Sequence, residues 1–472
     1  MMTSAPASAR AKPDAATIAT VTQALAASFG NRLVTSMAVR QQHGHTTTWT
    51  PNQPPDAVVF AQTTEDVAAV VKLCAQHGMP VIAFGTGTSL EGHVNAPYGG
   101  VCIDLSMMKD ILAVHAEDLD CVVQAGVTRK QLNEYLRDMG LFFPIDPGAD
   151  ASIGGMAATR ASGTNAVRYG TMKDLVLALK VVLASGEIIT TAHRAKKSSA
   201  GYDLTRLFVG SEGTLGIITE ITLRLSGIPE AISAATCPFP SVKAACDAVI
   251  ETIQTGLPVA RIELVTDLVV RGINNYSKLG LPESTMLFLE FHGSESSVAE
   301  QAERFGEIAE GYGGGPFAWT VHPEERTKLW QARHDVFWAL STLRPGAKGV
   351  STDICVPISR LADCVVETQE DAESIGLLCP IVGHVGDGNF HCCPLIMVDD
   401  PVEMERVEGF LERLARRGLA MEGTCTGEHG IGQGKIKYMK EEFEPAALDA
   451  MRAIKAALDP KNILNPGKIT AA

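Results

Sequence analysis

The spacing of apolar residues predicts alternating helices and short strands in the first half of the chain. An apolar stripe at three- and four-residue steps predicts a helix over 64–77, with Thr64 able to cap its first turn. The same reasoning predicts helices over 14–28, capped by Asp14, and over 128–139. Short apolar blocks bounded by turn residues predict strands over 58–60, 80–84, 101–105, 121–125, 179–183, 187–190 and 217–224.

A cluster of residues that interrupt regular structure separates this half from the rest. Gly227, Pro229, Pro238 and Pro240 place a domain boundary within 227–240. Helices packed on one face of an antiparallel sheet fit the order of elements that follows, so the expected fold class is α+β. The elements predicted there are helices over 241–255, 296–310, 324–341 and 402–417, and strands over 259–265, 285–292, 317–321, 350–356, 379–384 and 390–397.

Length, charge and cysteine content limit the class of protein. At 472 residues the chain exceeds the ~250–300 residues of a single core, which agrees with two domains. A net charge of −14 disfavours nucleic acid as a partner. The 11 cysteines form no C-x-x-C pair and predict reduced thiols in the cytoplasm. We expect a disordered tail over 1–14, and no apolar run reaches the ~18 residues of a membrane helix.

Glycine and small hydroxyl residues cluster at 85–89, 146–165 and 210–216. Glycine lets the backbone approach a ligand and turn its N–H groups inward, and Ser and Thr add hydroxyl donors. One such loop would more often be an ordinary turn, but three in one domain favour a pyrophosphate-containing cofactor. The first loop lacks the third glycine of a dinucleotide-binding fingerprint, because residue 90 is Leu, so a nicotinamide cofactor is disfavoured.

A second glycine-rich segment, 430–435, imitates a phosphate-binding loop. A Walker A motif would need Gly at 429 and Ser or Thr at 436, but these positions hold His429 and Ile436. We therefore do not predict a nucleotide triphosphate site there.

Two short segments near the C-terminus have the composition of a metal site. His384 and His391 flank a turn that contains Gly386 and Gly388, and Glu428 precedes His429 in a second glycine-rich segment. Two imidazoles and a carboxylate suit Zn²⁺ or Mn²⁺ and leave coordination positions for substrate or water. Asp387 is a rival ligand; the alternative is that, between two glycines, it shapes the turn without binding the metal.

Neighbouring residues suggest a base and an anion clamp. His429 would stand beside the metal and could take a proton as a general base. Arg333, Arg344 and Lys348 are candidate cations for a substrate carboxylate, although each alone is more often a solvated surface charge.

Six segments together resemble a known family: 80–92, 146–170, 210–219, 384–391, 422–435 and 465–468. The chain is similar to the flavin-dependent D-2-hydroxy-acid dehydrogenases of the vanillyl-alcohol-oxidase-like FAD fold. These include cytochrome-type D-lactate dehydrogenases, the FAD subunit of glycolate oxidase and D-2-hydroxyglutarate dehydrogenase. The resemblance covers about residues 15–468, which is nearly the whole chain.

The resemblance implies a domain organisation and roles for individual residues. A two-part FAD-binding domain of the PCMH type would span 15–227, a substrate (cap) domain of antiparallel sheet covered by helices 228–420, and a C-terminal segment that returns to the FAD domain 421–472. The FAD surroundings would be Gly85, Thr86, Gly87, Thr88, Ser89, Asp146, Pro147, Gly148, Ser152, Gly155, Ser162, Gly163, Ile217 and Ile218. The remaining site would comprise the metal ligands His384, His391 and Glu428, the substrate contacts Arg333, Lys348 and Asn389, and the catalytic His429.

Within the family, the segment 350–357 most resembles the D-lactate dehydrogenase branch. Phe337 is apolar where a 2-hydroxyglutarate enzyme would carry a polar residue, which favours a short or apolar substrate. His93 is the sole histidine near the 85–93 loop, and we predict non-covalent FAD. The expected reaction is metal-assisted oxidation of D-lactate to pyruvate by hydride transfer to the flavin.

Three alternatives remain open at this point. One is oxidation of glycolate or D-2-hydroxyglutarate, another is an oxidase that reduces O₂ directly, and the third is a non-catalytic FAD-binding subunit of a larger complex. Electrons would pass to a cytochrome, a quinone or an electron-transfer flavoprotein. We expect a cytoplasmic protein, with peripheral attachment to the inner membrane and a dimeric state left open.

Overall fold

The computed structural model describes residues 10–45, 48 and 50–470, which form two compact units. The first unit comprises the chain up to Ser162, Thr171–Gly227 and Glu428–Ala472. The second unit comprises Gly163–Gly170 and Ile228–Gly427. Most of the predicted tail, residues 1–9, lies outside the described residues. Among the described helices, none is long and apolar enough to cross a membrane.

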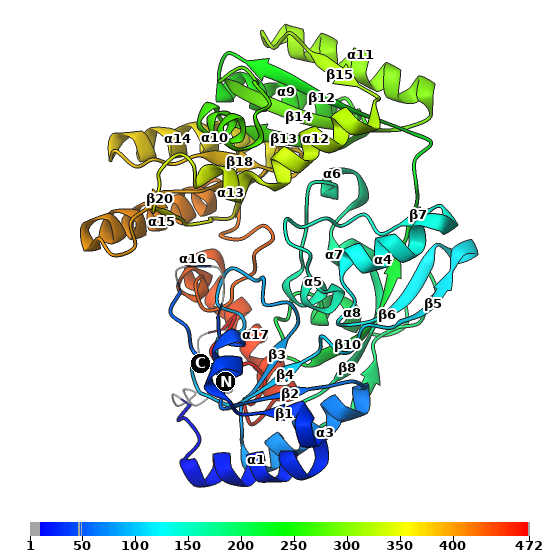
Figure 1. Ribbon diagram of the computed structural model, residues 1–472, viewed down its shortest axis with the longest axis vertical. Helices are drawn as coiled ribbons and strands as arrows, with labels where there is room; N and C mark the ends of the chain where they lie inside the picture. Colours follow the sequence, from blue (N-terminus) through cyan, green and yellow to red (C-terminus); the bar gives the residue numbers. More distant parts are fainter. Residues whose placement is uncertain (1–9, 46–47, 49, 471–472) are drawn as a thin grey trace. The chain divides into compact units, whose positions relative to one another are not determined.

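The first unit contains a small parallel sheet with the strand order β1-β2-β4-β3 (Figure 1). Strands β2, β4 and β3 pair in parallel, and β1 joins the edge in antiparallel orientation. The crossover between β2 and β3 is the helix α3, whose cap is Thr63 and not the predicted Thr64, because the Thr63 side chain accepts from Asp66 N. Asp14 caps α1 as predicted. The bounds are β1 Leu33–Val34, β2 Ala57–Phe60, β3 Val81–Phe84, β4 Val101–Asp104, α1 Ala15–Phe29, α2 Met37–Gln42 and α3 Thr64–His77.

A second, antiparallel sheet of the first unit has the order β5-β6-β10-β8-β9, and β7 pairs separately with β11. Its apolar side chains join those of α1 and α3 in one continuous core. The bounds are β5 Ile111–His115, β6 Asp120–Gln124, β7 Leu141–Phe142, β8 Val176–Val182, β9 Ile188–Thr190, β10 Ile217–Arg224, β11 Ser226–Gly227, α4 Arg129–Leu136, α5 Ile153–Thr159, α7 Met172–Leu175 and α8 Leu204–Phe208.

The last part of the chain completes the first unit. After Glu428 it forms α16 (Met439–Glu442) and α17 (Pro445–Leu458) and then runs beside β3. There Val81 N donates to Ile463 O at 2.8 Å and Asn465 N donates to Val81 O at 2.8 Å. Backbone hydrogen bonds therefore extend the parallel sheet with residues nearly 400 positions away.

The second unit is built on a seven-stranded antiparallel sheet with the order β15-β12-β14-β13-β18-β19-β17. Strands β16 and β20 form a separate pair. The strand bounds are β12 Ala231–Phe239, β13 Val259–Val265, β14 Thr285–Gly293, β15 Ala318–Thr320, β16 Lys348–Gly349, β17 Ile354–Cys355, β18 Ile381–Gly383, β19 Asn389–Cys392 and β20 Leu395–Ile396.

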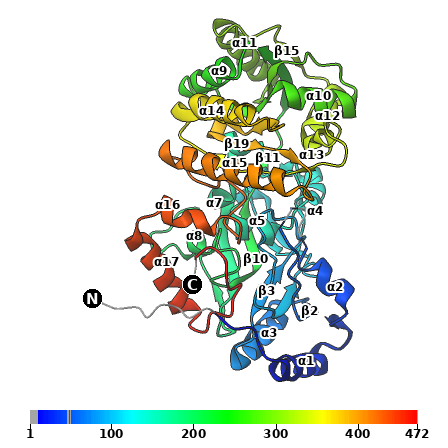
Figure 2. The same cartoon turned by 90° about the vertical axis from the view of Figure 1, so that its left-hand side faces the viewer.

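Helices cover both faces of this sheet, and not one face as the sequence predicted (Figure 2). Phe305 of α11 packs against Phe291 on one face, whereas Phe288 and Val265 on the other face pack against α10, α12 and α13. β14 is buried along nearly its whole length, as expected for a strand covered on both sides. The helix bounds are α6 Ala166–Tyr169, α9 Val242–Gln254, α10 Asp267–Ser277, α11 Glu295–Gly311, α12 Pro323–His334, α13 Val336–Leu340, α14 Leu361–Ser374 and α15 Pro401–Ala420.

The segment 227–240, in which the sequence predicts the domain boundary, also contains the strand β12. β12 pairs with β14 over all nine residues, including Pro238 opposite Met286. The Pro238 carbonyl accepts from Gly315 N, so the backbone polar groups of Pro238 face away from β14. Its missing N–H therefore breaks no hydrogen bond between β12 and β14.

Two further predictions were wrong: the helix over 324–341 is interrupted at Asp335, and the strand over 350–356 is reduced to Ile354–Cys355.

Candidate active site

Polar side chains occupy one end of the sheet face that α10, α12 and α13 cover elsewhere. On β13, Val265 packs in the apolar core, but Glu263 and Arg261, two and four residues earlier on the same face, are polar. The antiparallel register places Leu264 beside Gly383 and Val382 beside His391, so His384 follows next to Glu263. Strand pairing thus gathers a charged row from residues far apart in the sequence.

The structure brings the predicted metal ligands together. His384 lies directly after β18 and His391 lies in β19, and their rings are 5.3 Å apart between centroids and nearly perpendicular. One ligand atom from each of His384, His391 and Glu428 lies within 4.8 Å of the other two. Among the described residues Asp387 does not join this group. Gly427, the residue before Glu428, lies against the Asn389 amide. A Cβ on Gly427 would be 2.4 Å from Asn389 Nδ2.

Hydrogen bonds fix the tautomers of both histidines. The His391 Nδ1 atom lies 2.8 Å from the carbonyl oxygen of Thr352, which can only accept, so Nδ1 carries the proton. The His384 Nδ1 atom lies 2.7 Å from the Glu263 carboxylate and donates in the same way. In the neutral rings, Nε2 then carries the lone pair that a metal needs. The donor set and its tautomers therefore fit a divalent cation.

The carboxylate that holds His384 is buried and also binds Arg333. Glu263 is fully buried, and Arg333 Nη2 donates to it at 2.5 Å. Burial alone would raise the pKa of Glu263, but His384 and the Arg333 guanidinium outweigh it and hold that pKa below the ordinary value. Glu263 is thus an anion whose charge Arg333 balances.

The predicted substrate cations have different environments. Arg333 uses Nη2 for Glu263, and its buried Nε has no hydrogen-bond partner among the described residues, so a donor is left for an anionic ligand. Arg344 is instead committed to Glu403 and to the Leu395 carbonyl, which makes it structural. Lys348 is exposed in β16, and the Phe337 ring would approach a Cβ on its neighbour Gly349 within 3.8 Å.

Asn389 is buried, and its amide hydrogens are already used. Nδ2 donates to Asp353 Oδ1 at 2.7 Å and to Ile354 O at 2.9 Å. A contact between Asn389 and a substrate is therefore restricted to Oδ1 as an acceptor. The prediction that Asn389 touches substrate stays a prediction.

In the first unit, the three glycine-rich loops converge. A Cβ on Gly85 would lie 2.2 Å from Ser152 Oγ, Gly210 N donates to Ala157 O, and Glu212 N donates to Ala158 O. Ser152 caps α5 by accepting from Gly155 N. Loops 85–89, 146–155 and 210–216 therefore meet at the end of β3 and at α5.

Two buried groups in these loops indicate a ligand. The hydroxyl oxygens of Ser89 and Ser211 are buried and have no hydrogen-bond partner among the described residues. Unpaired buried hydroxyls are costly unless a ligand or water satisfies them. Thr86 and Thr88 add two hydroxyls 3.2 Å apart in the first loop. Hydroxyls and close-approaching backbone fit a pyrophosphate, as FAD contains.

The remaining predicted cofactor residues lie around these loops or in the core. Asp146 is buried, and around Gly148 the space for a Cβ is open within the described part of the chain. Ile217 and Ile218 begin β10, and their side chains pack in the core of the first unit. Gly87 adopts φ 68°, a conformation that favours glycine.

The segment that resembled a phosphate loop binds a protein carboxylate. Ile431 N and Gly432 N donate to the two carboxylate oxygens of Glu212, at 2.7 and 2.8 Å. A Cβ on Gly430 would lie 2.6 Å from Glu212 Oε1 and 2.7 Å from His93 Nε2. Burial would raise the pKa of Glu212, but His93 and these N–H donors lower it. The half-buried His429 thus precedes an anchored loop.

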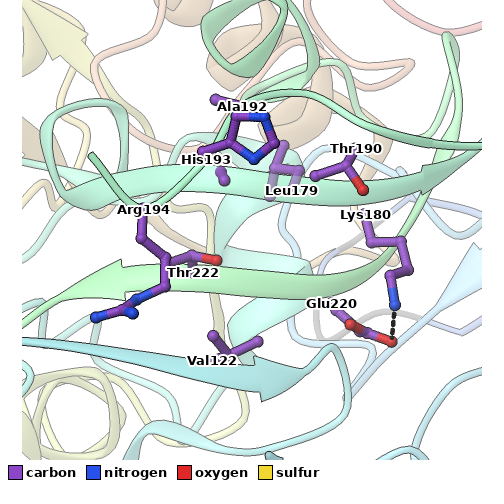
Figure 3. A pocket seen from close by; sticks show the side chains of 10 residues that line it. Val122, Leu179, Lys180, Thr190, Ala192, His193, Arg194, Glu220 and Thr222 are labelled. Atoms are coloured by element: carbon purple, nitrogen blue, oxygen red, sulfur yellow. Dashed lines mark hydrogen bonds and ion pairs between the residues drawn. The ribbon is translucent and has the colours of Figure 1, made fainter. Parts of the chain in front are cut away.

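A separate pocket lies on the five-stranded sheet of the first unit (Figure 3). Its charged lining residues are paired: Lys180 with Glu220 at 2.8 Å, and Arg194 with Asp118 and Asp120. Each cationic side chain of the pocket lining, Lys180 and Arg194, therefore already has a carboxylate partner.

Sequence reasoning missed Glu263 and Glu212. The signal for Glu263 was present, since Arg261 and Glu263 alternate with apolar residues in a buried strand, where a charge needs a partner. The partners Arg333 and His384 are 70 and 121 residues away. Glu212 binds backbone N–H groups about 220 residues away, for which its own neighbourhood gives no signal.

Comparison with known proteins identifies the family of the chain. The family described as FAD linked oxidases, C-terminal domain, matches residues 228–469, and the FAD binding domain family matches residues 55–192. A probable mitochondrial D-lactate dehydrogenase of Danio rerio is 54% identical, over 92% of this chain and 88% of that protein. The mitochondrial D-lactate dehydrogenase [cytochrome] of Arabidopsis thaliana is 48% identical, over 88% and 73%.

Two further comparisons extend the range. The glycolate oxidase subunit GlcD of Bacillus subtilis is 35% identical, over 88% of this chain and 89% of that protein. The solved structure of p-cresol methylhydroxylase with substrate bound superimposes with a TM-score of 0.81, over 96% of this chain and 97% of that one. At 17% identity this last likeness shows the fold alone, which is that of the PCMH-type flavoproteins.

Proposed function

The chain belongs to the family of FAD-linked oxidases, and on that premise we propose that it oxidises D-lactate to pyruvate. The single observation that carries the proposal is the group His384–His391–Glu428 with Arg333 held nearby by Glu263. A cation site next to a guanidinium with a spare donor suits a small molecule with adjacent hydroxyl and carboxylate groups. D-2-hydroxy acids have that chemistry.

Each residue has a distinct task in the proposed reaction. When bound, FAD supplies the hydride acceptor and a divalent cation at His384, His391 and Glu428 supplies a Lewis acid for the 2-hydroxyl. Arg333 binds and orients the substrate carboxylate through its spare guanidinium N–H groups, assisted by Lys348. His429, the residue after Glu428, takes the proton of the 2-hydroxyl as C2 loses hydride, which leaves the 2-oxo acid.

Phe337 supports the choice of a short substrate. It follows Arg333 by four residues, and its ring approaches Gly349 beside Lys348. A bulky apolar ring beside Lys348 would leave a second carboxylate of D-2-hydroxyglutarate without a polar partner there. Glycolate, which lacks the methyl group, is the second candidate because of the 35% identity to a glycolate oxidase subunit.

The test is turnover of purified protein with a dye acceptor on D-lactate, L-lactate, glycolate and D-2-hydroxyglutarate. We expect D-lactate to give the highest kcat/KM, loss of activity after chelation, and recovery with Zn²⁺ or Mn²⁺. Full activity after the metal is stripped would overturn the role of the cation. A folded sample without flavin absorbance would overturn the whole proposal.

The electron acceptor and the place of action belong to the same proposal. We infer a separate acceptor of the cytochrome type, as in the name of the Arabidopsis relative, and not O₂. Peroxide formation at the rate of lactate oxidation would contradict this. From the cysteines, none of which forms a disulfide in the described part of the chain, we further propose that the enzyme acts in the cytoplasm. Cell fractionation with an activity assay would test this and would show whether activity also sediments with the inner membrane.

A further inference from the structure

Glu263 presents one carboxylate oxygen to the proposed substrate cation and the other to a proposed metal ligand. Arg333 Nη2 donates to Oε2 at 2.5 Å, and His384 Nδ1 donates to Oε1 at 2.7 Å. The carboxylate is buried in the sheet, with 1% of its side chain exposed. Both bonds lie within the second unit and involve β13, α12 and the end of β18.

We propose that Glu263 is a positioning residue that couples the cation site to the substrate-carboxylate site. The inference rests on the proposed function, because it assigns Arg333 to substrate and His384 to the cation. By holding Nδ1–H, Glu263 directs the lone pair of Nε2 to the cation and makes the imidazole a better ligand. By holding Nη2, it fixes the guanidinium and leaves Nε for the substrate.

The geometry requires both oxygens to accept, which the isosteric amide cannot do. In Glu263→Gln one oxygen is replaced by an NH₂ group, which would face another donor on either Arg333 or His384. Either one of the two partners must turn away, or His384 must move its proton to Nε2 and accept at Nδ1, which removes the lone pair that faces the cation. Glu263→Asp keeps the charge but is one methylene shorter, so it retains at most one of the two bonds at its present length.

Another buried carboxylate on the same sheet gives a matched control. Glu290 lies on the neighbouring strand β14 opposite Arg261, with its Oε1 2.7 Å from His292 Nε2. It is 6% exposed, against 0% for Glu263, and it forms ion pairs with Arg261 and His292. Glu290→Gln removes a buried negative charge from the same sheet but should leave the cation ligands in place.

The experiment titrates Zn²⁺ and Mn²⁺ into the chelator-treated, FAD-loaded protein in competition with a chromogenic chelator, without substrate. We expect Glu263→Gln to weaken cation binding about 10- to 100-fold relative to wild type. In turnover at saturating cation, its kcat should largely recover while KM for D-lactate stays about tenfold raised, because excess metal cannot reposition Arg333. Glu290→Gln should bind the cation as the wild type does.

The outcomes separate two failures. If the wild type binds neither cation, the metal part of the proposed function fails and this inference falls with it. If the wild type binds and Glu263→Gln matches it in cation affinity and KM, or if Glu290→Gln weakens cation binding equally, the inference alone is overturned. Flavin content and Tm report folding. Should Glu263→Gln not fold, Glu263→Asp decides: wild-type cation affinity and KM in that variant would overturn the coupling.

Discussion

The two units build their candidate sites from different material. The first unit uses short glycine-rich loops whose backbone and hydroxyl groups converge at β3 and α5. The second unit uses charged side chains on adjacent strands, which satisfy one another across the sheet. A backbone-built site depends on space for the chain, whereas a side-chain-built site depends on the pairing of buried charges. Substitutions should therefore affect the two sites in different ways.

The largest effect is expected where the chemistry itself is touched. His429→Ala should lower kcat about 10²- to 10⁴-fold, because no group would take the hydroxyl proton. Flavin content and cation affinity should stay near wild-type values, since Glu212 anchors the loop through backbone N–H groups that the substitution keeps. Steady-state kinetics on D-lactate measure the loss, with the exposed His193→Ala as the control. An unchanged kcat would remove His429 as the base.

A smaller effect is expected when space in the backbone-built site is filled. The Cβ of Gly85→Ala would lie 2.2 Å from Ser152 Oγ, so Ser152 must leave the cap of α5 or the loop must shift. Such crowding costs about 1–3 kcal/mol. We expect absorbance to show less bound flavin per protein molecule. The sheet of the second unit should stay intact.

Two other glycines sharpen this test. Gly227→Ala meets nothing within 4 Å and should retain full flavin. Gly148→Ala also meets nothing among the described residues, so a loss of flavin in that variant would come from the cofactor itself. Full flavin retention by Gly85→Ala would contradict the close approach of the two loops.

Lys468, in the first unit, should make the free energy of unfolding depend on pH. We expect this effect to be no larger than that of Gly85→Ala. Lys468 is 3% exposed, its Nζ donates to Asn95 O, and burial lowers its pKa to about 7 against the attraction of Glu212. In the unfolded chain the pKa of Lys468 has its ordinary value of ~10.4. At pH values between about 7 and ~10.4 the unfolded chain therefore binds more protons than the folded chain. The free energy of unfolding should therefore rise with pH across this window, by up to ~1.4 kcal/mol per pH unit.

Lys468→Met should remove this rise. Denaturant unfolding at pH values from 7 to 9.5 measures it, and the exposed Lys440→Met should behave as the wild type. Identical pH profiles for Lys468→Met and wild type would show that the burial of this amine has no such consequence.

The smallest effect on activity is expected from the thiols. No cysteine among the described residues forms a disulfide, and all of them are buried except Cys355, which is partly exposed in the second unit. Burial raises the pKa of Cys393 to about 12, so its thiolate is scarce at neutral pH. We expect one fast-reacting thiol with a disulfide reagent in native protein. Cys355→Ser should abolish that fast phase and Cys393→Ser should not; several fast thiols would contradict the burial.

The sequence was most informative where a signal is local. Periodicity placed α3 and β10 closely, and composition singled out the three glycine loops and the histidines that the structure brings together. It failed where partners are distant. No strand was predicted at β12, because its prolines are visible in the sequence while its pairing with β14 is not. Glu263 and Glu212 were missed because their charges are satisfied only by tertiary contacts.

The return of the last segment to the first unit has a consequence for synthesis of the protein. Glu428, the residue after Gly427, contributes to the ligand group, and Ile431 and Gly432 satisfy the buried carboxylate of Glu212. A nascent chain that has emerged only as far as the second unit lacks all three. We therefore expect that stable capture of the cation waits until translation is nearly complete, so unfinished chains would not become active.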